Sequence, residues 1–129
     1  MKRILIVDDE EDIRDVLELI LEAEGYSVKT ATNGDEALQL QQAFQADVLI
    51  TDIIMPEKDG ITLIKQLRQD YPATKIIAVS GGGDPADYKP DAITTTVYLS
   101  TATVEGADAV LSKPFDRASI IETVASMVQ

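Results

Sequence analysis

Residues 4–9 read Ile-Leu-Ile-Val-Asp-Asp, four apolar side chains followed at once by two carboxylates. An uninterrupted apolar run of this length predicts a strand that is covered on both faces, as in a parallel sheet with helices on either side. Polar residues directly after such a strand lie at the carboxyl edge of the sheet, where α/β folds bind their ligands. These six residues therefore predict both the fold class and the edge that carries the chemistry.

Four more short runs have strand character, and the helical patterns lie between them. The run at 27–31 is the least apolar and is expected at an edge of the sheet. Because strands and helices alternate, we predict an α/β fold with right-handed crossovers, namely a flavodoxin-like doubly wound five-stranded parallel sheet of order 2-1-3-4-5 with five helices. The expected strands cover residues 4–7, 27–31, 48–51, 76–79 and 109–112.

Apolar spacing predicts the helices. The clearest pattern places five residues on the inner face of the first helix, which Gly25 ends. The second helix is expected over 35–46, the third over 61–71 before Pro72, and the last from about Asp116. The β-branched segment 81–106 is predicted to hold a helix, because a strand there would leave no crossover to the fifth strand. The five inner residues are Ile13, Val16, Leu17, Ile20 and Leu21.

Composition limits the possible functions. The 129 residues suit one domain, and we expect no output domain. The chain has no cysteine and no histidine, which excludes thiolate and imidazole chemistry, and its net charge of −12 opposes direct nucleic-acid binding. The apolar run at 4–7 is too short for a signal peptide or a membrane span, so we expect a cytoplasmic protein that does not bind a membrane.

Polar residues follow four of the five expected strands: Asp8 and Asp9, then Asp52, Ser80 and Lys113. The order 2-1-3-4-5 puts the first and third strands side by side, which gathers the three carboxylates into one pocket. Such a group repels itself unless a cation neutralises it, and oxygen ligands without His or Cys favour Mg²⁺. With a hydroxyl and an ammonium suited to phosphate oxygens, the set describes a phosphoryl-transfer site at which an Asp attacks phosphorus.

Four segments, taken in order, resemble the signature of response-regulator receiver domains. They are Ile6–Glu10, Asp52–Gly60, Ser80–Gly81 and Lys113–Phe115. Each alone is a weak signal, whereas the ordered set covers nearly the whole chain and is specific. The resemblance implies a phosphorylation-activated switch of a two-component phosphorelay and not a conventional enzyme. It also implies a histidine kinase or phosphotransfer protein as the phosphoryl donor, and a downstream protein target or a phosphorylation-linked homodimer.

The same resemblance assigns roles to individual residues. Asp52 would be the phosphoacceptor, and Ser80 and Lys113 would bind the phosphoryl oxygens. Mg²⁺ would be held by Asp9, Asp52 and the backbone carbonyl of Ile54, with Asp8 assisting through water. The Lys113-Pro114 peptide bond would be cis and would aim the Lys.

Two other functions remain open from the sequence. One is a Mg²⁺-dependent phosphatase with an Asp nucleophile, although such enzymes normally carry Asp-x-Asp after the first strand. The other is a receiver-shaped binding module that is never phosphorylated. The presence of Asp9, Asp52 and Lys113 argues against the second, and Val110 keeps it open, because receiver domains often have an aromatic residue at that position. Residues 10–12, all acidic, are interpreted as a first helical turn that complements the helix dipole.

Overall fold

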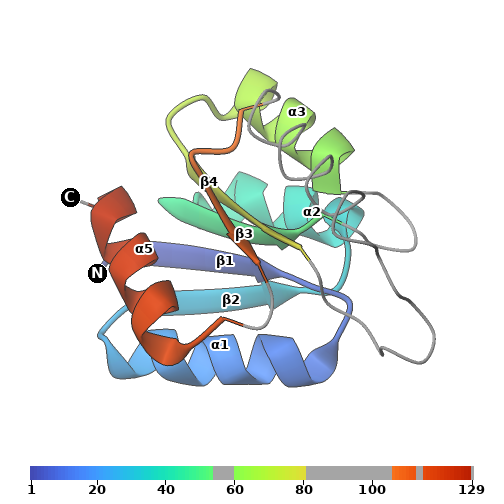
Figure 1. Ribbon diagram of the computed structural model, residues 1–129. Helices are drawn as coiled ribbons and strands as arrows, with labels where there is room; N and C mark the ends of the chain where they lie inside the picture. The colour runs from blue at the N-terminus through green and yellow to red at the C-terminus, as the bar shows by residue number, and fades with distance from the viewer. Residues whose placement is uncertain (54–59, 81–105, 113–114, 129) are drawn as a thin grey trace, which may run out of the picture.

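The computed structural model describes residues 1–53, 60–80, 106–112 and 115–128 (Figure 1). Five strands form one parallel sheet in the order β2-β1-β3-β4-β5, as predicted. The strands are β1 Arg3–Val7, β2 Ser27–Ala31, β3 Val48–Asp52, β4 Lys75–Ser80 and β5 Ala109–Ser112. The helices of the described residues are α1 Glu11–Ala23, α2 Gly34–Phe44, α3 Gly60–Asp70 and α5 Arg117–Val128. The helix expected within 81–106 falls largely outside the described residues.

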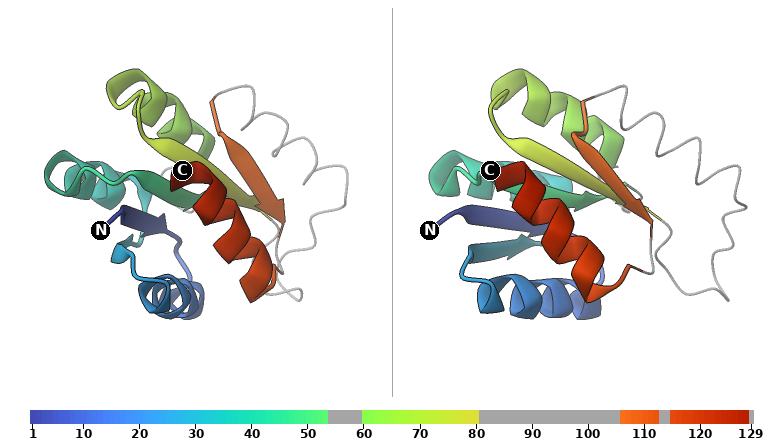
Figure 2. Two further views of the ribbon diagram at one scale, coloured as in Figure 1. Left: turned by 90° about the vertical axis from the view of Figure 1, so that its left-hand side faces the viewer. Right: turned by 60° about the vertical axis from the view of Figure 1, so that its left-hand side comes forward.

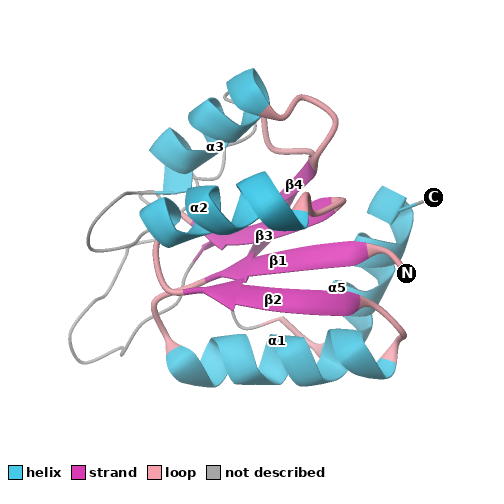
Figure 3. Cartoon of the chain, turned by 180° about the vertical axis from the view of Figure 1, so that it is seen from behind, coloured by secondary structure: helices cyan, strands magenta, loops and turns pink. Residues whose placement is uncertain are grey.

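Helices cover both faces of the sheet (Figure 2), so the α/β prediction is confirmed. In β1, Leu5 packs with the core under α2 and α3, whereas Ile4 and Ile6 pack with the core under α1 and α5. Figure 3, seen from behind, shows α2 in front of the strands and α5 beyond them. Continuous apolar runs are therefore needed, because successive strand residues face two different cores.

One expected core residue of α1 is on the surface. Leu17 and Leu21 are buried, but Val16 is 52% exposed, so its inward assignment was wrong. Successive residues of an α-helix differ by about 100° around the axis. With Leu17 at the centre of the buried face, Val16 falls at the margin, beyond Ile13 and Ile20, which are half-buried. Apolar spacing gave the helix correctly but not its rotation against the sheet.

A buried side-chain amide joins three segments at the amino edge of the sheet. Gln41 of α2 is 1% exposed. Its Oε1 accepts the backbone N–H of Ala46 at 3.1 Å, and its Nε2 donates to Thr74 Oγ1 at 3.1 Å. The Thr74 hydroxyl also donates to the Ala46 carbonyl. This network fixes the turn after α2 against the segment that enters β4.

Arg68, in the last turn of α3, ties the starts of β4 and β5 together. Its Nη2 donates to Asp108 Oδ2 at 2.7 Å and to the carbonyl of Gly106 at 2.6 Å. The same Asp108 oxygen accepts the N–H of Ile76 in β4 at 2.8 Å. Gly106 has φ +124°, and a Cβ there would stand 3.0 Å from Arg68 Nε, so a residue without a side chain fits this contact.

Helix α5 begins where the sequence predicted. Asp116 precedes it, and its Oδ1 accepts the N–H of Ser119 at 2.7 Å, as an N-cap does. The backbone and side-chain hydrogen bonds from Ser119 hold the pKa of Asp116 below its ordinary value. A lowered carboxyl pKa means that this cap stabilises the fold above the unfolded pKa, and that its contribution is lost as the pH falls.

The Gln41 network predicts a large difference between two neighbouring glutamines. Gln41→Ala leaves the buried N–H of Ala46 without its acceptor and should lower the free energy of unfolding by about 2 kcal/mol. Gln42→Ala, at an exposed position of the same helix, should change it by less than about 0.5 kcal/mol. Urea denaturation measures both. Equal losses in the two variants would show that the network does not stabilise the fold.

Candidate functional site

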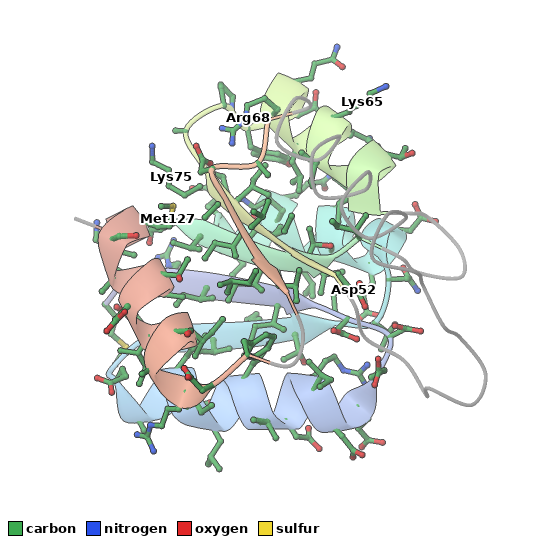
Figure 4. The ribbon with its side chains drawn as sticks, viewed as in Figure 1. Asp52, Lys65, Arg68, Lys75 and Met127 are labelled. Carbon is green, nitrogen blue, oxygen red and sulfur yellow. The ribbon has the colours of Figure 1, made fainter. Side chains whose placement is uncertain are left out.

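Four carboxylates meet at the carboxyl edge of the sheet. Asp8, Asp9, Glu10 and Asp52 each offer one oxygen, and these oxygens all lie within 4.8 Å of one another. The strands explain the meeting, because β1 and β3 are parallel neighbours with Val7 opposite Thr51. Both strands therefore end at the same level of the sheet. The predicted convergence of Asp8, Asp9 and Asp52 is confirmed, and Figure 4 shows Asp52 at the end of the sheet opposite Lys75.

Asp8 is fixed by its backbone and its side chain. It is 3% exposed, and its N–H continues the β1–β2 ladder by donating to the Ala31 carbonyl at 3.1 Å. Its Oδ1 accepts the N–H of Glu10 at 2.9 Å, and its carbonyl accepts Nη1 of Arg14 at 2.7 Å. These bonds fold the chain into a tight turn after β1. The turn keeps the next two acidic residues close to Asp8.

Asp52 occupies the last position of β3, opposite Val79 of β4. It is 5% exposed. The hydroxyl of Thr51 donates to its carbonyl at 2.9 Å, and the following N–H, that of Ile53, donates to the Val79 carbonyl at 2.9 Å. The backbone on both sides of Asp52 is therefore held in the sheet. The carboxylate of Asp52 is therefore attached to a backbone that cannot move easily.

Glu10 is the member of the cluster that the sequence interpretation missed. It occupies the N-cap position of α1, where its side chain makes no capping hydrogen bond. Its carboxylate instead joins the other three, whereas Glu11 and Asp12 do form the acidic first turn that was expected. The sequence could have indicated this, because Glu10 directly follows Asp8 and Asp9 at the edge of the sheet.

The cluster has the chemistry of a site for a hard cation. Two unit charges about 4.8 Å apart repel by about 3 kcal/mol at an effective dielectric near 20. The ligand atoms are all carboxylate oxygens, and they come from two buried residues, the half-buried Glu10 and the exposed Asp9. Oxygen ligands with one side open to water suit an ion that keeps part of its hydration. The donor set therefore fits a divalent cation such as Mg²⁺.

The other predicted site residues are placed only in part. Ser80 is the last residue of β4, paired with Ser112, which ends β5 directly before Lys113. The strand ends thus follow the predicted pattern, but the side chain of Ser80, the whole of Ile54 and the Lys113-Pro114 peptide lie outside the described residues. Val110, at the position where receiver domains often carry an aromatic, is 40% exposed. No described helix is long and apolar enough to cross a membrane.

The chain is similar to curated proteins of known type. It is 33% identical over 128 residues to the alkaline phosphatase synthesis transcriptional regulatory protein PhoP of Bacillus subtilis, an alignment that covers 99% of this chain and 49% of PhoP. It is 32% identical over 128 residues to the sensor kinase CckA of Brucella abortus, covering 98% of this chain and 12% of CckA. The chain therefore spans about half or less of these two relatives.

Solved structures of similar length have the same fold. The chemotaxis protein CheY4 of Vibrio cholerae superimposes with a TM-score of 0.82 at 29% sequence identity, and the match covers 98% of each chain. A CheY-like receiver domain protein of Methanospirillum hungatei gives a TM-score of 0.84 at 29% identity, over 98% of this chain and 92% of that one. The match thus extends over nearly the whole chain.

A family model supplies the assignment. The model described as the response regulator receiver domain matches residues 4–125, which include the whole sheet and the acidic cluster. This match, together with the relatives and the shared fold, means that the site belongs to a phosphoacceptor that works as a signalling switch and not as an enzyme with a turnover substrate. The chain belongs to the response regulator receiver domain family, the phosphorylation switches of two-component systems.

Proposed function

We propose that Asp52 is the residue that accepts the phosphoryl group. The observation that carries this proposal is the position of its carboxylate, which is buried, fixed at the end of β3 and surrounded by Asp8, Asp9 and Glu10. In the reaction, a carboxylate oxygen of Asp52 forms a bond to phosphorus while the bond from phosphorus to the donor's leaving group breaks. The products are an acyl phosphate on Asp52 and the donor without its phosphoryl group.

A cation would be needed for this step. A carboxylate crowded by three others is a poor place to bring a phosphate dianion, because like charges oppose the approach. Mg²⁺ bound by Asp9 and Asp52, with the Ile54 carbonyl and with Asp8 assisting, would neutralise the charge and orient the phosphoryl oxygens. By the resemblance to the family, Ser80 and Lys113 would donate hydrogen bonds to the remaining phosphoryl oxygens.

The partners follow from the chemistry of the switch. The family implies a kinase, and we assign the role of donor to a histidine kinase or a phosphotransfer protein in the cytoplasm. Phosphorylation adds a charge of about −2 and shifts an equilibrium between two conformations. We propose that residues 1–129 form one receiver domain and that the shift changes its binding to a downstream protein or to a second copy. Because the exposed residue 110 is a valine and not an aromatic, the conformational change would reach the surface through other elements.

The phosphoacceptor is tested by incubating the protein with acetyl phosphate and following the intact mass. The wild type should gain one phosphoryl group only when Mg²⁺ is present, because the carboxylate cluster repels the anion otherwise. Asp52→Asn should gain none, and Asp70→Asn, an equal charge change at the exposed end of α3, should behave as the wild type. An adduct on Asp52→Asn, or rapid turnover without an adduct in the wild type, would contradict the proposal.

The role of Asp9 in cation binding gives a second prediction. Asp9→Asn should weaken Mg²⁺ binding by about tenfold or more, since even residues that only orient a metal ligand contribute about that much. Asp12→Asn, in the acidic first turn of α1, removes the same charge and should have a much smaller effect. Isothermal titration with MgCl₂ measures both affinities. Comparable losses would mean that overall charge, and not ligation by Asp9, governs binding.

A further inference from the structure

Arg14 binds both ends of the turn that carries the acidic residues. It lies in α1, where its backbone N–H donates to the carbonyl of Glu10 at 3.1 Å. Its side chain reaches back past the turn, and Nη1 donates to the carbonyl of Asp8 at 2.7 Å. Within the described residues this is the one side-chain hydrogen bond that Arg14 makes. One residue thus closes a loop around Asp8, Asp9 and Glu10.

The carbonyl that Arg14 binds is cut off from water. Asp8 is 3% exposed, so its carbonyl needs a partner within the protein. If the partner is lost, the peptide group between Asp8 and Asp9 can regain hydrogen bonds by rotating. That rotation changes ψ of Asp8 and φ of Asp9, which are two of the torsions that set the position of the Asp9 carboxylate relative to Asp52. The bond to Arg14 therefore fixes the direction of a proposed cation ligand that it does not touch.

We propose that Arg14 is a positioning residue of the phosphorylation site, which holds the turn after β1 so that the Asp8 and Asp9 carboxylates are ready for the cation. This inference rests on the proposed function of the cluster as a cation-assisted phosphoacceptor site. Arg14 would thus affect the reaction by holding the cation ligands in place, without touching the phosphoryl group. The charge of Arg14 has the opposite effect, because a cation next to the cluster opposes binding of a second cation.

The two effects predict changes of opposite sign, which makes the residue testable. Arg14→Met removes both the hydrogen bond and the charge. If positioning dominates, Mg²⁺ affinity falls by about tenfold, the loss typical of residues that orient a metal ligand. If charge dominates, Mg²⁺ affinity rises. Lys2→Met makes the same change of net charge at the other end of β1 and serves as the matched control.

The experiment measures the Mg²⁺ dissociation constant by isothermal titration, and the rate of phosphorylation by acetyl phosphate as a function of Mg²⁺ concentration. For Arg14→Met we expect a higher half-saturating Mg²⁺ concentration and a rate near the wild-type value at saturation, with Lys2→Met unchanged. Arg14→Lys keeps a donor and the charge and should recover part of the affinity. If Arg14→Met does not fold, Arg14→Lys carries the test, with a smaller loss expected.

Other results would overturn the inference. Tighter Mg²⁺ binding by Arg14→Met would show that its charge governs the site. A lower unfolding temperature with an unchanged Mg²⁺ half-saturation would show a role in stability only. The measurements on the wild type distinguish these results from a failure of the proposed function itself. If the wild type itself neither binds Mg²⁺ nor gains a phosphoryl group, the proposed function is wrong, whatever the variants do.

Discussion

The mutual repulsion of four carboxylates is the constraint around which this structure is organised. Asp8 and Asp52 end adjacent parallel strands, and Asp9 and Glu10 follow in a turn that hydrogen bonds hold closed. Separate acidic side chains would avoid one another in solution. The sheet prevents this, because moving either strand end would break the ladder between β1 and β3 or between β3 and β4. The fold thus holds four carboxylates together whose charge a bound cation would neutralise.

The rest of the fold supplies the rigidity that this site requires. Apolar side chains on both faces of the sheet form two separate cores, so the central strands cannot shift on either side. At the opposite edge, Gln41 and Arg68 fasten the segments that enter β4 and β5. Figure 4 shows Arg68 far from Asp52 along the sheet. Gln41 and Arg68 thus hydrogen-bond to their neighbours at one edge, whereas four carboxylates are brought together at the other edge.

The sequence predicted those features that depend on strand order and periodicity. The sequence predicted that Asp8, Asp9 and Asp52 lie close together. Parallel strands end at one edge of the sheet, and the order 2-1-3-4-5 makes the first and third strands neighbours. Glu10 and Arg14 could not be placed, since the direction of each side chain depends on the geometry of a turn. The burial of Gln41 was missed and Val16 was wrongly predicted to face inward, because burial depends on the helix rotation that packing selects. The predictions for Ile54, Lys113 and most of segment 81–106 concern residues outside the described part of the chain.

The most direct test of this account is the stability of the site without and with its cation. Urea unfolding of the wild type and Asp52→Asn is compared in a chelator and in saturating MgCl₂. Without the cation, removing one charge from the cluster should make Asp52→Asn the more stable protein, and Mg²⁺ should then raise the unfolding free energy of the wild type by more than that of the variant. A variant that is less stable than the wild type in the chelator, with equal gains from Mg²⁺, would contradict the account.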